Sequence, residues 1–203
     1  SGKTPTGDKS AATKLPDFSN KIFGFTAGGA IIKNKLFFFV SGEKQDAQTP
    51  QPFDQANFRN PPGTQAFSDT VGLIRTKLSG YGYDPGAYLN IPDLLKSTKL
   101  ATKITWNINS KNRLNVSYRY TKSERSLTSA STSTTVNFFN GGYFFPSTTN
   151  SASLELTSNL ASNVSNKLLV TYTAVFDDRN PLGSNFPRVI VNSVNGSRYQ
   201  FGS

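Results

Sequence analysis

The chain has 203 residues, of which only 35% are hydrophobic, and a formal net charge of +10. It contains no Cys and no His, which excludes disulfides, thiolate nucleophiles, Cys-ligated zinc and catalysis by a histidine base. No stretch approaches the roughly 18 consecutive apolar residues of a membrane helix. The low apolar content suits strands that keep one polar face better than it suits a large packed core.

The positive charge is dispersed along the chain. Lys and Arg occur singly, and no basic run carries interleaved aromatic residues. We therefore expect these side chains to line a lumen or to lie near lipid phosphates, and we expect no nucleic-acid partner. The chain also lacks Met and shows no signal peptide, which predicts a mature or internal segment of a longer protein.

The first hairpin is predicted near the start of the chain. Residues 1–19 are polar and read as a linker or loop. Residues 20–45 predict two strands joined by a link over residues 28–35. The second strand, centred on residues 36–40, is apolar on both faces. Its inner face therefore requires a cover, such as a plug inside a barrel.

Residues 46–98 form the longest predicted connection and contain one short helix. Ser68 is a suitable N-cap and Gly80 a suitable C-cap for this helix. Three apolar residues between them follow helical spacing: Val71, Ile74 and Leu78. A long loop with its own helix is a structured excursion that is often functional.

Residues 99–121 give the clearest hairpin signal. Apolar and polar residues alternate on both sides of a short polar turn at residues 109–112. A period of two predicts strands with one apolar and one polar face, and strands of about ten residues can cross a bilayer when tilted. The predicted apolar face carries Ile104, Trp106, Leu114, Val116, Tyr118 and Tyr120.

A second long loop is predicted over residues 122–150, and it ends in an aromatic cluster. Such rings could contact a ligand, because they offer large and rigid contact area. The alternative, which we favour, is that they pack loop on loop or lie at the membrane interface, where any barrel has an aromatic belt. The candidate ligand-binding residues are Phe138, Phe139, Tyr143, Phe144 and Phe145.

The third hairpin is predicted over residues 151–178, with its turn at residues 161–166. Residues 179–203 follow it and predict a further hairpin around Asn195-Gly196, a strong turn signal between short apolar runs. Six strands thus form three hairpins, each closed by a short turn, and long loops join one hairpin to the next.

This arrangement predicts an all-β fold, specifically a segment of a transmembrane antiparallel β-barrel with long extracellular loops and one short loop helix. Short turns at one end and long loops at the other are typical of outer-membrane barrels. A soluble β-sandwich would also show the alternation, but the difference in loop length favours the membrane. In this scheme residues 46–98 and 122–150 are extracellular loops, and residues 179–203 are an extracellular loop hairpin.

Part of the sequence resembles a known family. Residues 23–40, FGFTAGGAIIKNKLFFFV, resemble the early barrel of TonB-dependent outer-membrane receptors of the Oar-like group. There a Gly-Gly-Pro-Ile-Ile hairpin precedes a Lys-Leu-Phe-Phe-Phe strand, and Ala30 stands where Pro is usual. Residues 81–86 and 194–196 are also similar to that group.

The resemblance implies a barrel of about 22 strands with a plugged lumen. It implies a location in the bacterial outer membrane and energy supplied by TonB through the plug. It further implies uptake of a scarce, bulky nutrient, with peptides or proteins as the suggested cargo. The expected partners are outer-membrane lipid, the rest of the barrel and plug, and TonB. Whether a surface lipoprotein is a further partner is left open.

Two other functions are alternatives to a transporter wall. A non-transporting structural or adhesive barrel could bind partner proteins through the same loops. An enzyme is not expected, although Glu155 and Asp177 are potential acids, because the sequence has no paired carboxylate motif, nucleophile elbow or metal-ligand spacing. We accordingly predict no catalytic residue, no metal and no cofactor.

Overall fold

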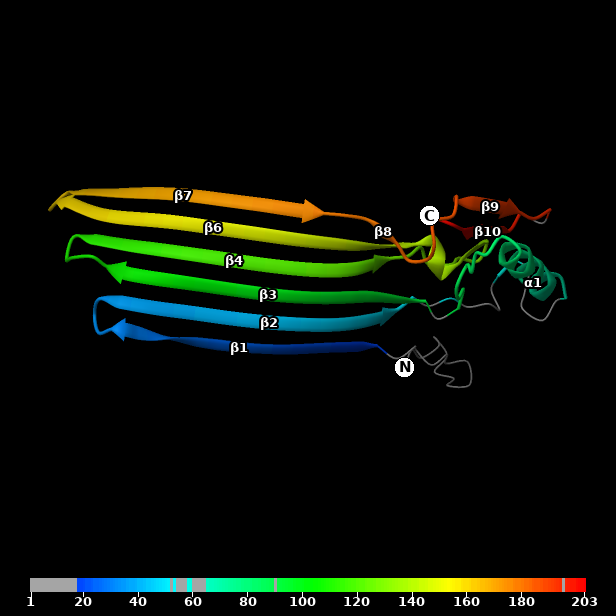
Figure 1. The fold of residues 1–203 in the computed structure, drawn as a ribbon, viewed down its shortest axis with the longest axis horizontal. Coiled ribbons are helices and arrows are strands. Elements are labelled where there is room, and N and C mark those ends of the chain that lie inside the picture. The colour runs from blue at the N-terminus through cyan, green and yellow to red at the C-terminus, as the bar shows by residue number, and fades with distance from the viewer. Residues whose placement is uncertain (1–17, 52, 54–57, 60–64, 90, 195) are drawn as a thin grey trace, which may run out of the picture.

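The computed structural model describes residues 18–51, 53, 58–59, 65–89, 91–194 and 196–203. Within this part of the chain, a long sheet of antiparallel strands carries a small folded unit at one end (Figure 1). Apart from residues 18 and 19, the predicted N-terminal linker lies outside the described residues. The all-β prediction is confirmed, since strands predominate and α1 is the one α-helix of the described part.

Six long strands make up the sheet, each antiparallel to its neighbours, in the order β1-β2-β3-β4-β6-β7. A short strand, β8 (Asn180–Pro181), also pairs with β6. Within the described residues the sheet stays open, with β1 and β7 as its edges. The long strands are β1 (Ser19–Ile32), β2 (Leu36–Pro50), β3 (Pro92–Asn107), β4 (Asn112–Leu127), β6 (Tyr143–Ala161) and β7 (Val164–Asp177).

The strands extend further than the sequence predicted. The link expected over residues 28–35 shrinks to residues 33–35, because the strand continues through two β-branched residues to Ile32. Asn34 makes the turn possible with φ 60, a left-handed conformation that Asn tolerates. Likewise the turn expected over residues 161–166 is only the two residues between β6 and β7.

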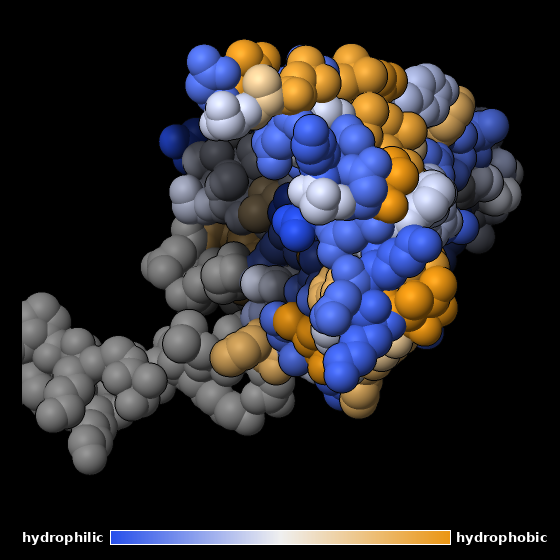
Figure 2. Space-filling view, turned by 90° about the vertical axis from the view of Figure 1, so that its left-hand side faces the viewer, coloured by the Kyte–Doolittle hydropathy of each residue, from blue (hydrophilic) through white to orange (hydrophobic). Residues whose placement is uncertain are grey.

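The strand register sorts the side chains onto two faces. Val116 lies opposite Ile104 and Leu154, and this face, here named the apolar face, continues in both directions. Its neighbour Asn115 lies opposite Thr105 and Glu155 on the other face, named the polar face. Figure 2 looks along the strands from the end with the short turns. Hydrophobic side chains gather over the top and right of the molecule, with hydrophilic ones between them.

The sheet has no buried hydrophobic core in the described residues. Val116 lies in the middle of the apolar face and is 41% exposed, and Val170, in the same row on the edge strand β7, is 54% exposed. Every buried hydrophobic side chain that the structure describes lies outside the six long strands. The apolar face is therefore open, and no described helix is long and apolar enough to span a membrane.

The small unit, here named the cap, contains all of the buried core. It consists of α1 (Gln65–Ser79), β5 (Thr135–Asn137), the 3-10 helix η2 (Phe139–Gly141), β9 (Val189–Asn192) and β10 (Arg198–Phe201), together with the described residues before and after α1 and before β9 that contact the same core. β10 pairs antiparallel with β9 and parallel with β5. The core comprises Phe58, Val71, Ile74, Leu78, Tyr83, Val136, Phe138, Tyr199 and Phe201.

The cap brings segments of both predicted long connections and of the tail together in one folded unit. Its helix also begins at Gln65, three residues before the expected N-cap Ser68. The left-handed residue after the helix is Gly82, with φ 69, rather than Gly80. Tyr83 N donates to Leu78 O at 3.0 Å and Gly82 N donates to Ser79 O at 2.9 Å, which is the Schellman pattern.

Candidate functional site

A cavity of about 420 Å³ lies where the sheet meets the cap. Its volume falls within the roughly 300–1,000 Å³ of small-molecule sites. The ends of β4 and β6 contribute Leu127 and Tyr143, and the cap contributes Phe138 and Phe201. Segments after β7 add two cationic side chains, Arg179 and Arg188, and the polar side chains of Asn185 and Gln200. β5 adds the amide of Asn137.

Strand pairing fixes the sheet side of this cavity. Tyr143 lies opposite Leu127 on β4 and opposite Pro181 on β8. The chain passes very close to itself here, because a Cβ on Gly142 would lie 2.6 Å from the Leu127 carbonyl oxygen. Only glycine fits this approach without a shift of backbone, so the sequence Gly141-Gly142 lets β6 begin directly beside the end of β4.

Two buried aromatic rings form the floor of the cavity. Phe138 is only 2% exposed and packs edge-on against Phe201, with ring centroids 6.2 Å apart. On its other side, Phe138 contacts Tyr88 at 5.8 Å between ring centroids. Such edge-to-face pairs stabilise a defined ring orientation. Both rings are almost fully buried, so they form the packed base of the cavity and expose little surface of their own.

Two arginines give the cavity its charge. The guanidinium carbon of Arg179 lies 5.1 Å from the ring centroid of Tyr143, a cation–π arrangement. Arg188 Nη2 donates to Gln200 Oε1 at 3.0 Å. No carboxylate side chain lines the cavity, and neither arginine forms an ion pair with a described residue. Both guanidinium groups can therefore donate hydrogen bonds to a bound anionic group.

A second aromatic pair lies next to the residues that line the cavity but does not line it. Tyr83 stacks on Phe186 with ring centroids 4.3 Å apart, and its hydroxyl donates to Asn140 O at 3.1 Å. Burial raises the pKa of the Tyr83 hydroxyl above 10.0, the usual value for tyrosine. The side chain thus stays neutral and holds the segment of Asn140 against the turn after α1.

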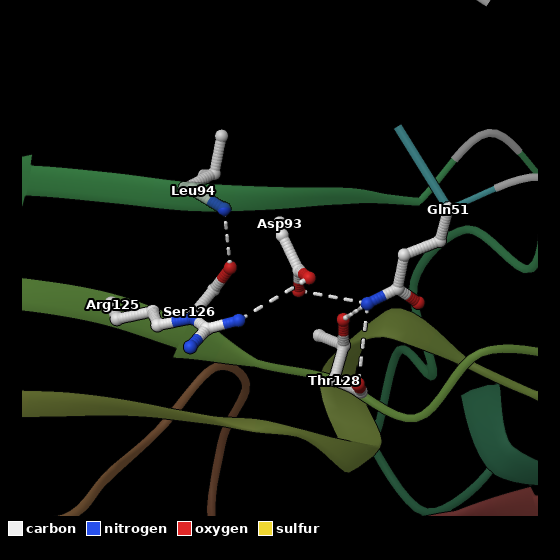
Figure 3. Close-up of polar contacts among 6 residues, drawn as sticks. All are labelled: Gln51, Asp93, Leu94, Arg125, Ser126 and Thr128. Atoms are coloured by element: carbon white, nitrogen blue, oxygen red, sulfur yellow. Dashed lines mark hydrogen bonds and ion pairs between the residues drawn. The ribbon is translucent and has the colours of Figure 1, made fainter. Parts of the chain in front are cut away.

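A polar network links the ends of three strands where the chain leaves the sheet toward the cap (Figure 3). Gln51 Nε2 donates to Asp93 Oδ1 at 2.8 Å and to Thr128 Oγ1 at 3.0 Å. Arg125 Nη2 lies 3.7 Å from Asp93 Oδ2. These residues lie at or just beyond the ends of β2, β3 and β4. The network therefore holds these three strands together at the end of the sheet.

The five residues of the predicted aromatic cluster do not all line the same cavity. Phe138 and Tyr143 line the cavity, whereas Phe139, Phe144 and Phe145 do not. Phe139 lies in η2, and its backbone N donates to Ala87 O at 2.7 Å. Phe144 and Phe145 lie in β6 rather than in a loop, and they point to opposite faces of the sheet.

Sequence reasoning missed the tail residues of this cavity. Arg179 and Arg188 flank a segment with two prolines and no strand periodicity, so only their shared charge could have drawn attention to them. Within the described residues, no group of three or more acidic side chains is placed to hold a metal ion.

The fold and cavity together define an all-β protein with an open apolar sheet face and a ligand-sized, positively charged cavity. Comparisons of the chain with protein-family models, with curated proteins and with solved structures find no match.

Proposed function

We propose that this chain is part of the wall of a TonB-dependent transporter in the bacterial outer membrane, which takes up a scarce, bulky nutrient such as a peptide or protein. The observation that carries the proposal is the open apolar face of the sheet. Successive rows across the strands are apolar there, and the row through Trp106 contains Ile32, Leu36, Trp106, Leu114, Leu156 and Leu168.

The size of this face fits a bilayer. Four rows, from that of Leu114 to that of Tyr120, extend about 20 Å along the strands at roughly 3.4 Å per residue. The apolar band of an outer-membrane barrel is about 25 Å tall. Exposed patches of more than a few hundred Å² mark contact surfaces, and lipid would cover this one along its whole length.

The polar face supports a watery or protein-filled interior. Hydrogen bonds cross it from strand to strand, such as Thr105 Oγ1 to Asn115 Oδ1 at 2.8 Å and Asn115 Nδ2 to Glu155 Oε1 at 3.2 Å. Phe37, Phe39 and Leu169 are apolar exceptions on this face, and Phe39 is 43% and Leu169 is 55% exposed. A plug from another part of the same protein would cover them.

The open edges require more strands. In lipid, the unpaired backbone groups of β1 and β7 would be costly, so further strands have to complete the barrel. In this proposal the cap lies outside the cell, and its cavity takes part in capturing the cargo. The TonB dependence rests on the resemblance of residues 23–40 to Oar-like receptors.

The membrane part of the proposal can be tested with two neighbouring residues of β6. Leu154→Cys and Ser153→Cys place a fluorophore on the apolar and the polar face of the full-length protein in liposomes. A quencher confined to the lipid should quench the label at position 154 strongly and the label at position 153 weakly. Equal quenching of both labels by aqueous iodide would contradict a lipid-facing sheet.

Transport is tested separately. The full-length protein should bind the purified periplasmic domain of TonB in detergent solution, and deletion of a TonB box should abolish this binding. If the labels show a membrane barrel but TonB does not bind, the non-transporting structural or adhesive barrel becomes the better proposal.

A further inference from the structure

We propose that Lys44, Thr98 and Lys122 form a binding site for the phosphate of a lipid headgroup on the outer surface of the sheet. This inference rests on the proposed membrane location and adds a specific lipid contact to it. The three residues lie on β2, β3 and β4, and the strand register places them side by side in one row, with Thr98 between the two lysines.

The row points to the same side as the apolar face. Lys44 is two residues from Gly42 and Lys122 is two residues from Tyr120, and Gly42, Leu100 and Tyr120 form the adjacent row of the apolar face. Side chains two apart in a strand share a face. The site therefore borders the apolar band directly, at its cap end, where headgroups would meet acyl chains.

The geometry suits a single phosphate. Neighbouring strands are about 4.8 Å apart, so the backbones of Lys44 and Lys122 are separated by about 10 Å. Two flexible four-carbon side chains can bring their ammonium groups together over this gap, above the hydroxyl of Thr98. Two cations and one hydroxyl donor match the acceptor oxygens of a phosphate.

Both lysines are available for such a ligand. They are exposed, and no hydrogen bond or ion pair joins either of them to another residue that the structure describes. The next row toward the cap has Lys21 opposite Asp46, and Lys96 between Asp46 and Glu124. Carboxylates thus accompany the lysines of that row, but none lies in the row of Lys44 and Lys122.

The outward rows that border the two ends of the apolar face differ in charge. At the end with the short turns, the corresponding outward row contains Asn112, Ser158 and Asn166 and has no cation. The lysine site is therefore placed for the leaflet on the cap side. A lipid is favoured over an acidic protein because an apolar surface that could hold acyl chains adjoins the cations.

The test uses full-length protein in neutral vesicles with added lipid A, either diphosphorylated or fully dephosphorylated, and counts bound lipid by native mass spectrometry. The wild-type protein should retain the phosphorylated form. The double variant K44Q/K122Q should bind it at least about tenfold more weakly, since each lysine near a headgroup contributes to anion binding. The matched control K103Q/R119Q removes two cations from the polar face of the same strands and should bind like wild type.

Several results would overturn the inference: equal retention of dephosphorylated lipid A, unchanged binding by K44Q/K122Q, or displacement of the lipid by millimolar inorganic phosphate. Stronger binding of a polyglutamate peptide than of lipid A would assign the site to an acidic protein instead. The label at position 154, measured in the same vesicles, separates the two proposals. Quenching by lipid without phosphate dependence contradicts only the lysine site, whereas no quenching by lipid contradicts the membrane proposal itself.

Discussion

Tyr199 of β10 lies directly opposite Val136 of β5, and both side chains are fully buried. This parallel pair joins the tail of the chain to the second long connection. Phe58 also packs edge-on against Tyr199, with ring centroids 6.1 Å apart, so a third segment meets the same point. The pair therefore forms the centre of the cap, and the cap depends on it.

We predict that Val136→Asp unfolds the cap and leaves the long sheet intact. A carboxylate at this position would be buried without a partner, which costs several kcal/mol. Hydrogen exchange of the full-length protein should then accelerate in residues 65–79 and 189–201 but not in β4 or β6. Val194→Asp is the control, because Val194 is fully exposed between β9 and β10. Slow exchange in the cap of Val136→Asp would show that the pair is not essential.

A second prediction concerns the charge of the cavity. Naphthalene-1-sulfonate, an aromatic anion, should bind there better than the neutral 1-naphthylmethanol in ligand-observed NMR with the full-length protein. Arg179→Gln should weaken sulfonate binding about tenfold, since a hydrogen bond to a charged group contributes roughly 1.5–3 kcal/mol. Phe144→Ala should have no effect, because Phe144 does not line the cavity. Equal binding of both probes would exclude an anion site.

The long sheet could be predicted from the sequence because its signal is local. Alternation depends on residues two positions apart, so the segments around Ile104 and Val116 show their strands without knowledge of their partners. The short turns are equally visible, since Asn109 and Asn112 bracket the β3–β4 turn. Alternation does not show where a strand ends, so the sequence predicts a loop at Tyr143, where the structure has the start of β6.

The cap could not be predicted because its contacts are distant in sequence. β5 has three residues and β10 has four, too few for a periodic pattern, and their parallel pairing joins distant segments. The helix end was predictable in part. Gly80 and Gly82 both suit a helix terminus, but Tyr83 provides the apolar contact with Leu78 that a Schellman motif prefers, which favours Gly82.

A third prediction concerns the polar network of Gln51, Asp93 and Thr128 at the cap end of the sheet. Gln51→Ala should allow the cap to move, because it removes the hydrogen bonds to Asp93 and Thr128. Spin labels at Leu73→Cys on α1 and Thr171→Cys on β7 should give a broader distance distribution in this variant of the full-length protein. Asp93→Asn should have a smaller effect, because the partly exposed ion pair with Arg125 contributes at most about 1 kcal/mol.

The control for this experiment is Gln45→Ala. Gln45 Nε2 also donates to a side chain on a neighbouring strand, Asn20 Oδ1 at 3.1 Å, but that bond is exposed and lies within the sheet. Its loss should leave the distance between cap and sheet unchanged. A distribution for Gln51→Ala as narrow as that of the wild type would mean that packing alone holds the cap in place.

The last prediction is a pH dependence of the cap. Because burial raises the pKa of Tyr83, the folded cap holds this proton more tightly than the unfolded chain does. The resulting stabilisation is fully present below pH 10.0, the ordinary tyrosine pKa, and is lost as the pH rises through the higher pKa of the folded state. Hydrogen exchange in α1 should therefore accelerate in this alkaline range.

Tyr83→Phe should reduce this alkaline acceleration and should destabilise the cap at neutral pH by about 1 kcal/mol, through loss of the hydrogen bond to Asn140 O. Tyr81→Phe is the matched control, because Tyr81 lies two residues away and is 71% exposed. If Tyr81→Phe removed the pH dependence as well as Tyr83→Phe does, burial of the Tyr83 hydroxyl would not be its cause.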